Sequence, residues 1–406
     1  MTILDRFSPR WVEIDIDAIR HNLEEIRKLV GPGVQVMAVV KADAYGCGAP
    51  VVSRALVDQG VEWLAVTSID EGIELRNRGI EARILMFNPL LKSQLRLAVD
   101  YDLTPTINSE DTAWSLAQIA RERKKVTRVH LKVETGMGRN GIFPEQAVDL
   151  IEKLAEQSHL EVEGIYTHLA AANSKRRSDQ QYTFEQFQRL QQVAETLSIQ
   201  GIRIPLRHIC NSAGLLAFPQ MHLDLVRTGT ILYGQYPSSA VPQLLNLKDP
   251  WHLKAKVVQV QDYPPGSGIG YGRTFITRRP SQIAVLPVGF VDGYTVEPVL
   301  RPRGFLDLIK VLTKDILSYL GVTLGSQKVK VEGQTAPVVG KVAMQSCMID
   351  VTGIPGVQVG SLVELIARRT TVSRRLPKLY LEKGLPLVAA IPDGEEHPVG
   401  RQFYPN

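Results

Sequence analysis

The sequence has 406 residues, of which 44% are hydrophobic and 22% are charged, and its formal net charge is +5. This length favours two domains, the composition excludes a disordered chain, and the scattered basic pairs do not favour nucleic acid as a partner. Three widely spaced cysteines indicate neither disulfides nor a metal site, and without a signal peptide or membrane span we expect a cytoplasmic protein.

The first half of the chain alternates short apolar strands with amphipathic helices. An alternating strand at residue 11 passes into a helix, and eight strand-like segments follow between about residues 33 and 235. Eight strands joined by helices favour a closed (β/α)8 barrel, an α/β fold of the TIM type, and an open doubly wound sheet is the alternative. The eight segments are VQVMAVVKA, WLAVTS, ARILMF, LTPTI, TRVHLKVET, EGIYTHL, LRHICNS and DLVRTGTIL.

The second half has a different character. A linker rich in Pro and Ser spans residues 236–250, and the segments after it are strands joined by Gly and Pro turns. One helical segment, residues 304–321, interrupts these strands. We therefore expect a barrel domain at residues 1–240 and a mainly β domain at residues 241–406.

The segment AVVKADAYGCG, residues 38–48, places Lys41 at the end of the first barrel strand. Side chains at the C-terminal ends of barrel strands face the active site of such folds. A lysine at a strand exit is usually only solvated, but a lysine shielded from water has a lowered pKa and can form a Schiff base. The glycines that follow let the backbone pass close to a ligand.

Other strands of the barrel end in polar side chains that would share this rim. The fifth strand carries Lys132 and leads into a Gly-rich loop with Arg139, which suits an anion or a phenolate. The sixth strand ends in His168. A single histidine there is more often structural than catalytic, so its interest comes from sharing the rim with Lys41.

The last two barrel strands end in CNSAG and VRTGT. Loops at these positions commonly bind phosphate, and Ser212, Gly229 and Thr230 offer hydroxyl and backbone N–H donors. Arg227 on the last strand would point to the barrel centre. A lysine amine, a phosphate site and an arginine on one rim together predict a site for pyridoxal 5'-phosphate.

These motifs resemble those of the alanine racemase family, in the family's order and over most of the chain. AVVKADAYGCG is similar to the family's cofactor-lysine segment, although Cys47 stands where histidine is usual. The resemblance implies a barrel with a β domain, a head-to-tail homodimer, and interconversion of L- and D-alanine for cell-wall peptidoglycan. The other matching segments are VHLKVETGMGRNG, GIYTHLAAAN, NSAGLL, DLVRTGTILYG, GIGYGRTF, LPVGFVDGY and VGKVAMQSCMIDV.

The resemblance also implies roles for individual residues. Lys41 would be the Schiff-base lysine and one of two catalytic bases, and Tyr271 of the partner subunit would be the other. The remaining implied contacts are Arg139 and Lys132 (often carbamylated in the family) near the cofactor's phenolic oxygen, Tyr45, Ser212, Gly229 and Thr230 at its phosphate, Arg227 at its ring nitrogen, His168 between Tyr271 and Arg227, and Met344 at the substrate carboxylate.

Five positions depart from the usual family pattern, and most of them lie near the implied substrate entrance. They are Gln345 and Asn173, where aspartate is usual, Phe290 and Arg374, where gate tyrosines are usual, and Val296, where arginine is usual. The helical segment at residues 304–321 also has no usual counterpart. These departures are compatible either with sequence drift in an alanine racemase or with a racemase that accepts larger or more acidic amino acids.

Three other functions are compatible with part of the pattern. A pyridoxal phosphate-dependent decarboxylase shares the two domains, but QSCMIDV matches its C-terminal signature poorly. A non-catalytic pyridoxal phosphate-binding protein would generally lack the β domain. A barrel aldolase could use Lys41 without a cofactor.

Overall fold

A computed structural model describes residues 8–296, 305–319, 328–390 and 396–398. The chain divides into two compact units, which we call the barrel unit, residues 16–249, and the β unit, residues 1–15 together with 250–406. The expected boundaries differ from this division in two places: residues 241–249 belong with the barrel unit, and residues 1–15 belong with the β unit. Strand β1 (Arg10–Asp15) pairs there with β10 (Trp251–Lys256) and with β19 (Lys378–Glu382).

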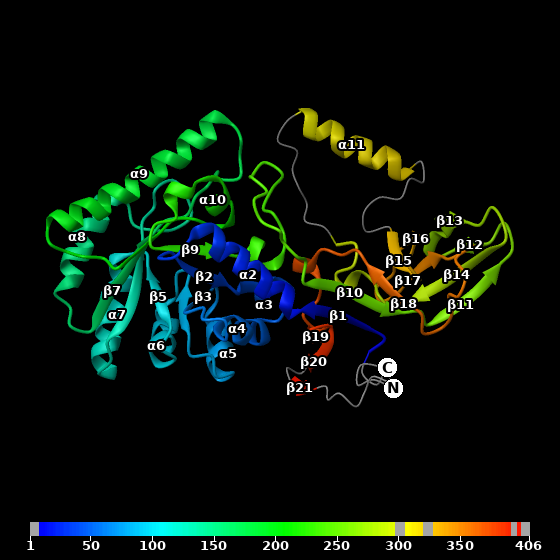
Figure 1. The fold of residues 1–406 in the computed structure, drawn as a ribbon, viewed down its shortest axis with the longest axis horizontal. Coiled ribbons are helices and arrows are strands. Elements are labelled where there is room, and N and C mark those ends of the chain that lie inside the picture. The colour runs from blue at the N-terminus through cyan, green and yellow to red at the C-terminus, as the bar shows by residue number, and fades with distance from the viewer. Residues whose placement is uncertain (1–7, 297–304, 320–327, 391–395, 399–406) are drawn as a thin grey trace. The chain divides into compact units, whose positions relative to one another are not determined.

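The barrel unit contains the eight parallel strands that the sequence predicts, in the order β8-β7-β6-β5-β4-β3-β2-β9 (Figure 1). Backbone hydrogen bonds also join its two end strands, from Asp224 N–H to Arg207 O at 3.2 Å and from Arg227 N–H to Cys210 O at 3.0 Å. The sheet is therefore a barrel, and the open doubly wound alternative is wrong. The strands are β2 (Gln35–Val39), β3 (Trp63–Val66), β4 (Arg83–Met86), β5 (Thr104–Ile107), β6 (Thr127–Lys132), β7 (Leu160–Tyr166), β8 (Leu206–His208) and β9 (Leu225–Thr228).

Helices surround these strands on the outside (Figure 1). Their starts follow from local chemistry: the Ser109 hydroxyl accepts the Thr112 N–H at 3.2 Å, and Pro144 begins the helix that follows β6. None of the described helices is long and apolar enough to cross a membrane. The helices are α2 (Ile16–Val30), α3 (Lys41–Gly46), α4 (Ala49–Val57), α5 (Ile69–Asn77), α6 (Lys92–Asp100), α7 (Glu110–Arg123), α8 (Pro144–Ala155), α9 (Arg177–Ile199) and α10 (Ser212–Ala217), with the 3-10 turns η1 (Pro219–Met221) and η2 (Thr230–Tyr233).

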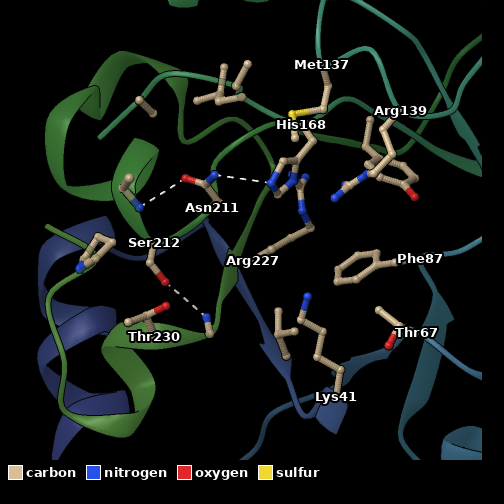
Figure 2. A pocket seen from close by; sticks show the side chains of 18 of the residues that line it. Lys41, Thr67, Phe87, Met137, Arg139, His168, Asn211, Ser212, Arg227 and Thr230 are labelled. Atoms are coloured by element: carbon tan, nitrogen blue, oxygen red, sulfur yellow. Dashed lines mark hydrogen bonds between the residues drawn. The ribbon is translucent and has the colours of Figure 1, made fainter. Parts of the chain in front are cut away.

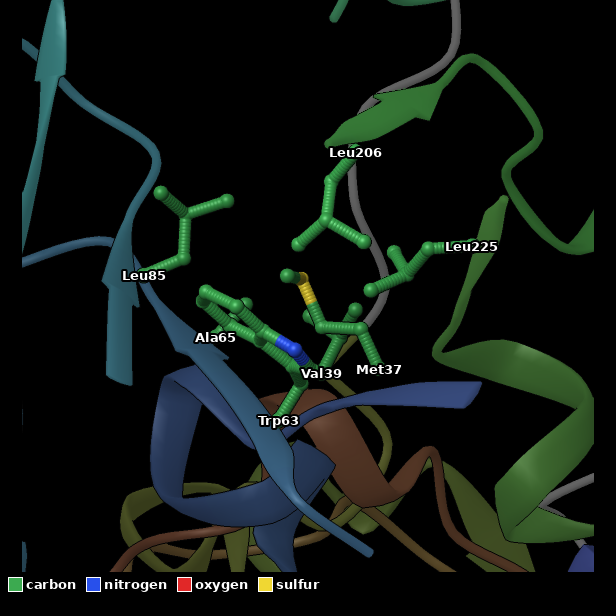
Figure 3. Packing of buried hydrophobic residues seen from close by; sticks show 7 residues of the cluster. All are labelled: Met37, Val39, Trp63, Ala65, Leu85, Leu206 and Leu225. Carbon is green, nitrogen blue, oxygen red and sulfur yellow. The ribbon is translucent and has the colours of Figure 1, made fainter. Parts of the chain in front are cut away.

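Alternation along the strands positions the polar rim above an apolar interior. Met37 and Val39 of β2 point into the barrel, and Lys41 follows at the same spacing of two. In the same way Leu225 of β9 is followed by Arg227. Figure 3 shows the cluster that fills the interior, composed of Met37, Val39, Trp63, Ala65, Leu85, Leu206 and Leu225.

The β unit is built around an eleven-stranded sheet, in the order β11-β14-β17-β16-β15-β18-β10-β1-β19-β20-β21. The predicted helix at residues 304–321 is present as α11 (Phe305–Tyr319). The remaining strands are β11 (Gln259–Tyr263), β14 (Ser281–Leu286), β15 (Lys328–Val331), β16 (Gln334–Val339), β17 (Cys347–Asp350), β18 (Leu362–Leu365), β20 (Leu385–Ala390) and β21 (Glu396–Pro398), with the separate hairpin β12 (Gly268–Ile269) and β13 (Phe275–Ile276). The described residues of this unit also form the 3-10 turns η3 (Tyr271–Arg273), η4 (Phe290–Asp292) and η6 (Arg369–Thr371).

Candidate active site

A cavity of about 360 Å³ opens at the C-terminal ends of the barrel strands (Figure 2). The barrel residues that the sequence singles out all line it, namely Lys41, Tyr45, Lys132, Arg139, His168, Ser212, Arg227, Gly229 and Thr230. Tyr271 and Met344 lie instead in the β unit, where their side chains are 74% and 61% exposed. The barrel unit therefore gathers the nine predicted barrel residues around one cavity.

Lys41 does not end the strand but begins a turn with left-handed backbone angles. The strand ends at Val39, and residues 42–45 all adopt left-handed backbone angles, with φ between 51° and 58°. A left-handed turn costs roughly 1–2 kcal/mol for each residue with a Cβ. Side chains hold this one in place, because the Ala42 N–H donates to Glu71 Oε1 at 2.6 Å and the Ala49 N–H to Asp43 Oδ1 at 2.8 Å.

Replacing Ala42 by glycine tests this strain. Ala42 is exposed, so Ala42→Gly removes an unfavourable Cβ without opening a cavity, and we expect the free energy of unfolding to stay level or to rise by up to about 1 kcal/mol. Ala117→Gly, in the right-handed interior of α7, is the control and should cost about 1 kcal/mol. Urea unfolding of both variants measures the contrast, and equal losses would contradict the strain.

The surroundings of the two lysines in the cavity disfavour their protonated, positively charged form. Burial, and then the nearby Arg139 charge, lower the pKa of Lys41, while Glu71 acts in the opposite direction. The same two causes lower the pKa of Lys132 to about 8, and its Nζ donates to Asn140 Oδ1. A larger share of neutral amine makes Lys41 a better nucleophile and a better base than an exposed lysine.

Arg227 and His168 form a buried contact at the back of the cavity. Arg227 is 3% exposed, and its Nη2 donates to Thr167 O at 2.8 Å and Ile209 O at 2.9 Å, with His168 Nδ1 at 3.4 Å. Burial lowers the pKa of Arg227 to about 10, so the guanidinium stays charged at neutral pH. Burial, and then Arg227, lower the pKa of His168 to about 2, which keeps its imidazole neutral.

The opposite side of the cavity presents hydroxyl groups against closely packed backbone. Ser212 Oγ accepts the Gly229 N–H at 3.2 Å, and a Cβ on Gly229 would lie 2.3 Å from the Tyr45 hydroxyl. Tyr45 also stacks on Tyr233, with ring centroids 4.9 Å apart. Burial raises the pKa of Tyr45 to about 12, so its phenol keeps the proton and can donate to an anion.

The loop that carries Arg139 is organised by Glu134, a residue that the sequence analysis did not single out. Glu134 Oε1 accepts the N–H groups of Gly136 at 2.7 Å and Met137 at 2.6 Å, and Oε2 accepts that of Arg139 at 3.2 Å. Burial opposes the charge of Glu134, but these backbone donors outweigh it and lower the pKa of the carboxyl. The carboxylate thus accepts backbone N–H groups of this irregular loop that in a sheet would donate to a neighbouring strand.

Replacing Glu134 by glutamine should loosen this loop. A carboxamide has one acceptor oxygen, so several donors among residues 136–139 would lose a bond to a charged group that is worth about 1.5–3 kcal/mol. We expect amide hydrogen exchange there to accelerate by about tenfold or more in Glu134→Gln. In the unchanged protein the same protection should be lost as the pH falls through the lowered pKa of Glu134. Glu156→Gln, at an exposed position, is the control. Unchanged exchange in Glu134→Gln would contradict the role of the carboxylate.

The cavity includes further residues that sequence analysis missed, among them Thr67, Phe87, Asn88, Met137 and Asn211. Asn211 had a detectable signal, since an asparagine before a helical segment is a preferred N-cap. Its Oδ1 accepts the N–H groups of residues 213 and 214 at 3.1 and 2.9 Å. Thr67 directly follows β3 and Asn88 lies two residues after β4, but neither residue type indicates a function by itself.

Of the five positions that depart from the family pattern, Asn173 lines the cavity and is exposed there. The other four lie in the β unit, and each is exposed, namely Phe290, Val296, Gln345 and Arg374. The barrel unit alone therefore contributes one of these positions to the cavity. Cys47 is buried beside the left-handed turn, and nothing in the structure explains why cysteine stands there.

Comparisons with known proteins agree with the fold. Residues 14–237 match the family described as alanine racemase, N-terminal domain, and residues 251–378 match alanine racemase, C-terminal domain. The alanine racemase of Halothermothrix orenii is 40% identical over 363 residues, which cover 89% of this chain and 88% of that protein. That of Methanococcus maripaludis is 38% identical, with coverage of 92% and 99%. The solved structure of alanine racemase from Clostridium difficile 630 has a TM-score of 0.83 at 30% identity, with coverage of 94% and 98%.

Proposed function

This chain belongs to the alanine racemase family and is an isomerase, and we propose that it interconverts L- and D-alanine with pyridoxal 5'-phosphate as its cofactor. The observation that carries the proposal is the gathering of Lys41, Arg227 and Ser212 around one cavity of about 360 Å³. An amine nucleophile, a ring-sized space and hydroxyl donors are what this cofactor requires.

The residues of the cavity fit the cofactor. Pyridoxal 5'-phosphate needs a lysine for its aldehyde, donors for its phosphate and a partner for its ring nitrogen. Lys41 has the lowered pKa of a nucleophilic amine, and Tyr45 and Ser212 carry hydroxyls beside the backbone that Gly229 brings close. Arg227 would donate to the ring nitrogen and leave it unprotonated, because a guanidinium has no acceptor. When bound, the group supplies an electron sink that makes the Cα proton of an amino acid acidic.

Racemisation requires that a proton leave one face of Cα and that another arrive on the opposite face. Lys41 would take or give the proton on one face through its Nζ. His168 is a poor second base because its pKa of about 2 leaves it little affinity for a proton. Tyr271, which is 74% exposed in the β unit, is available to another chain. We assign the second face to Tyr271 of the partner subunit, and this assignment requires a head-to-tail homodimer.

The remaining predicted residues would bind and orient the cofactor and the substrate. Arg139 would hold the phenolic oxygen of the cofactor, with Lys132 nearby, since both line the cavity and both carry donors. Thr230 adds to the phosphate donors at the start of η2, and Met344 of the partner subunit lies against the substrate carboxylate. His168 keeps Arg227 in place as a neutral ring within 3.4 Å of its Nη2.

Loading the purified protein with the cofactor tests the proposal. We expect visible absorbance that is lost on borohydride reduction, with the cofactor then attached covalently to Lys41 by mass spectrometry. A barrel aldolase would show no such absorbance, and a decarboxylase would release carbon dioxide from its amino acid. Colour without any enantiomer interconversion would favour a non-catalytic binding protein.

The exposed Asn173 at the cavity keeps a second candidate open, a racemase for larger or more acidic amino acids. Comparing the racemisation of alanine, serine, lysine and glutamate separates the two. A strong preference for alanine would exclude the broader enzyme. We further propose that the enzyme supplies cytoplasmic D-alanine for peptidoglycan. Expressing the gene in a D-alanine auxotroph tests this, because the strain should then grow without added D-alanine.

A further inference from the structure

A row of buried polar side chains continues below Arg227 into the barrel. His208 of β8 and His130 of β6 are both 0% exposed, and Glu163 of β7 is 4% exposed. The proposed function assigns no role to these three residues. Burying so many polar groups in a barrel interior is unfavourable unless they satisfy one another.

The hydrogen bonds of this row all donate in the same direction, away from Arg227. Arg227 Nη1 lies 2.9 Å from His208 Nδ1, and His208 Nε2 lies 2.8 Å from His130 Nδ1. Arginine only donates, so His208 Nδ1 must accept and the ring proton of His208 must be on Nε2. That proton is donated to His130 Nδ1, which places the proton of His130 on its own Nε2. Donation therefore runs from Arg227 through two neutral imidazoles.

Glu163 lies at the end of the row, next to His130. His130 Nε2 and Glu163 Oε1 face one another at 3.6 Å, and both atoms are buried without a hydrogen-bond partner among the described residues. The separation is about half an ångström longer than an N–H···O hydrogen bond. The other carboxylate oxygen, Oε2, accepts from Arg83 Nη1 at 3.0 Å. The carboxylate thus completes the row and connects it to the outside of the barrel.

Packing supports the same arrangement of the rings. Gly164 leaves room for His130, because a Cβ at position 164 would lie 2.7 Å from the imidazole. Tyr166 stacks on His208 with centroids 4.7 Å apart and planes within 8°. Burial lowers the pKa of both His130 and His208, which agrees with two neutral rings. The neighbours therefore fix the ring planes, and the hydrogen bonds fix the tautomers.

The row of polar side chains connects the buried positive charge of Arg227 with the carboxylate of Glu163. Among the described residues, no carboxylate forms an ion pair with Arg227, although its guanidinium is buried. A buried charge needs a counter-charge or a full set of hydrogen bonds. Glu163 is the carboxylate that the hydrogen-bond row reaches, and its negative charge strengthens each donation between it and Arg227.

We propose that Glu163, acting through His130 and His208, is a positioning residue: it accepts at the far end of the row, stabilises with Arg227 the tautomers of both rings, and thereby holds the donor orientation of Arg227 at the cofactor-ring site. The proposal rests on the proposed function for the role of Arg227, but not for the tautomers themselves. A carboxamide at position 163 could offer N–H to His130 Nε2 and move the His130 proton to Nδ1, where it would oppose the donation from His208, whereas a carboxylate can only accept.

The test combines 15N NMR of histidine-labelled protein with kinetics of the cofactor-loaded enzyme. In the unchanged protein, His130 and His208 should both show the neutral Nε2–H form. In Glu163→Gln that form should be lost from at least one ring, and kcat for alanine racemisation should fall on the order of tenfold with little change in KM. Arg83→Gln removes the outer hydrogen-bond donor of Glu163 and leaves Arg128, whose Nε lies 3.9 Å from the same Oε2, so it should leave the tautomers and kcat close to the unchanged protein.

Glu163→Asp separates positioning from packing. It keeps the charge and shortens the side chain, so it should retain both tautomers and more activity than Glu163→Gln, whereas a purely structural role would make the shorter residue the more damaging one. Unchanged tautomers in Glu163→Gln would overturn the proposal, as would an Nδ1–H or doubly protonated ring in the unchanged protein. If the unchanged protein fails to racemise alanine, the proposed function fails, while the NMR result still decides the tautomers.

Discussion

Lys41→Ala is expected to abolish both the visible absorbance of bound cofactor and the racemisation of alanine. The lysine is the nucleophilic amine of the cavity, so its loss removes the covalent attachment and one of the two proposed bases together. The loss of kcat should be at least about a thousandfold, because a general base alone contributes between a hundredfold and ten-thousandfold. Absorbance titration with the cofactor and a chiral assay measure the two effects.

The control for this variant is Lys92→Ala, which removes a lysine that is 72% exposed and pairs with Asp111 on the surface. It should leave absorbance and activity unchanged, since exposed ion pairs contribute little. Full activity in Lys41→Ala would contradict the assignment of the amine. Cofactor that stays covalently bound in this variant would contradict it as well.

Tyr271→Phe is expected to keep the absorbance and to impair proton removal from one enantiomer more than from the other. The variant removes the hydroxyl that we assign to one face of Cα and leaves Lys41 on the opposite face. Removal from the affected enantiomer should slow by roughly a hundredfold to ten-thousandfold. Net racemisation slows equally in both directions because the enantiomers have equal free energy, so only exchange of the Cα proton distinguishes the faces.

Deuterium incorporation into L-alanine and D-alanine in separate experiments is the measurement. Tyr263→Phe, another tyrosine of the β unit, is the control and should exchange both enantiomers at the unchanged rate. Equal impairment of the two enantiomers in Tyr271→Phe would count against two distinct bases. Mixing Tyr271→Phe with Lys41→Ala subunits tests the homodimer, because one of the two sites in a mixed dimer would then have both functional residues.

The barrel was predictable because its signals are local. Each strand alternates or is uniformly apolar, and the polar rim residues lie at or just beyond the ends of strands: Lys41 and His168 follow β2 and β7, and Arg227 lies near the end of β9. Strand β1 was placed in the wrong unit because alternation shows that residues 10–15 form a strand but not which sheet they join. Their partners, β10 and β19, are more than 200 residues away along the chain.

The supporting residues of the site were not predictable in the same way. Glu134 and Glu71 act on backbone N–H groups, and a glutamate in a loop or at a helix start has no distinctive pattern. The left-handed turn consists of Ala, Asp, Ala and Tyr, of which only aspartate commonly adopts such angles. The tertiary structure, not local preference, imposes that turn, so it becomes visible only in three dimensions.

Chiral analysis of alanine after incubation with the cofactor-loaded protein tests the central claim most directly. Starting from either pure enantiomer, we predict conversion to equal amounts of L- and D-alanine, with no loss of total alanine and no release of carbon dioxide. Retention of the starting enantiomer by a protein that carries bound cofactor would contradict the claim.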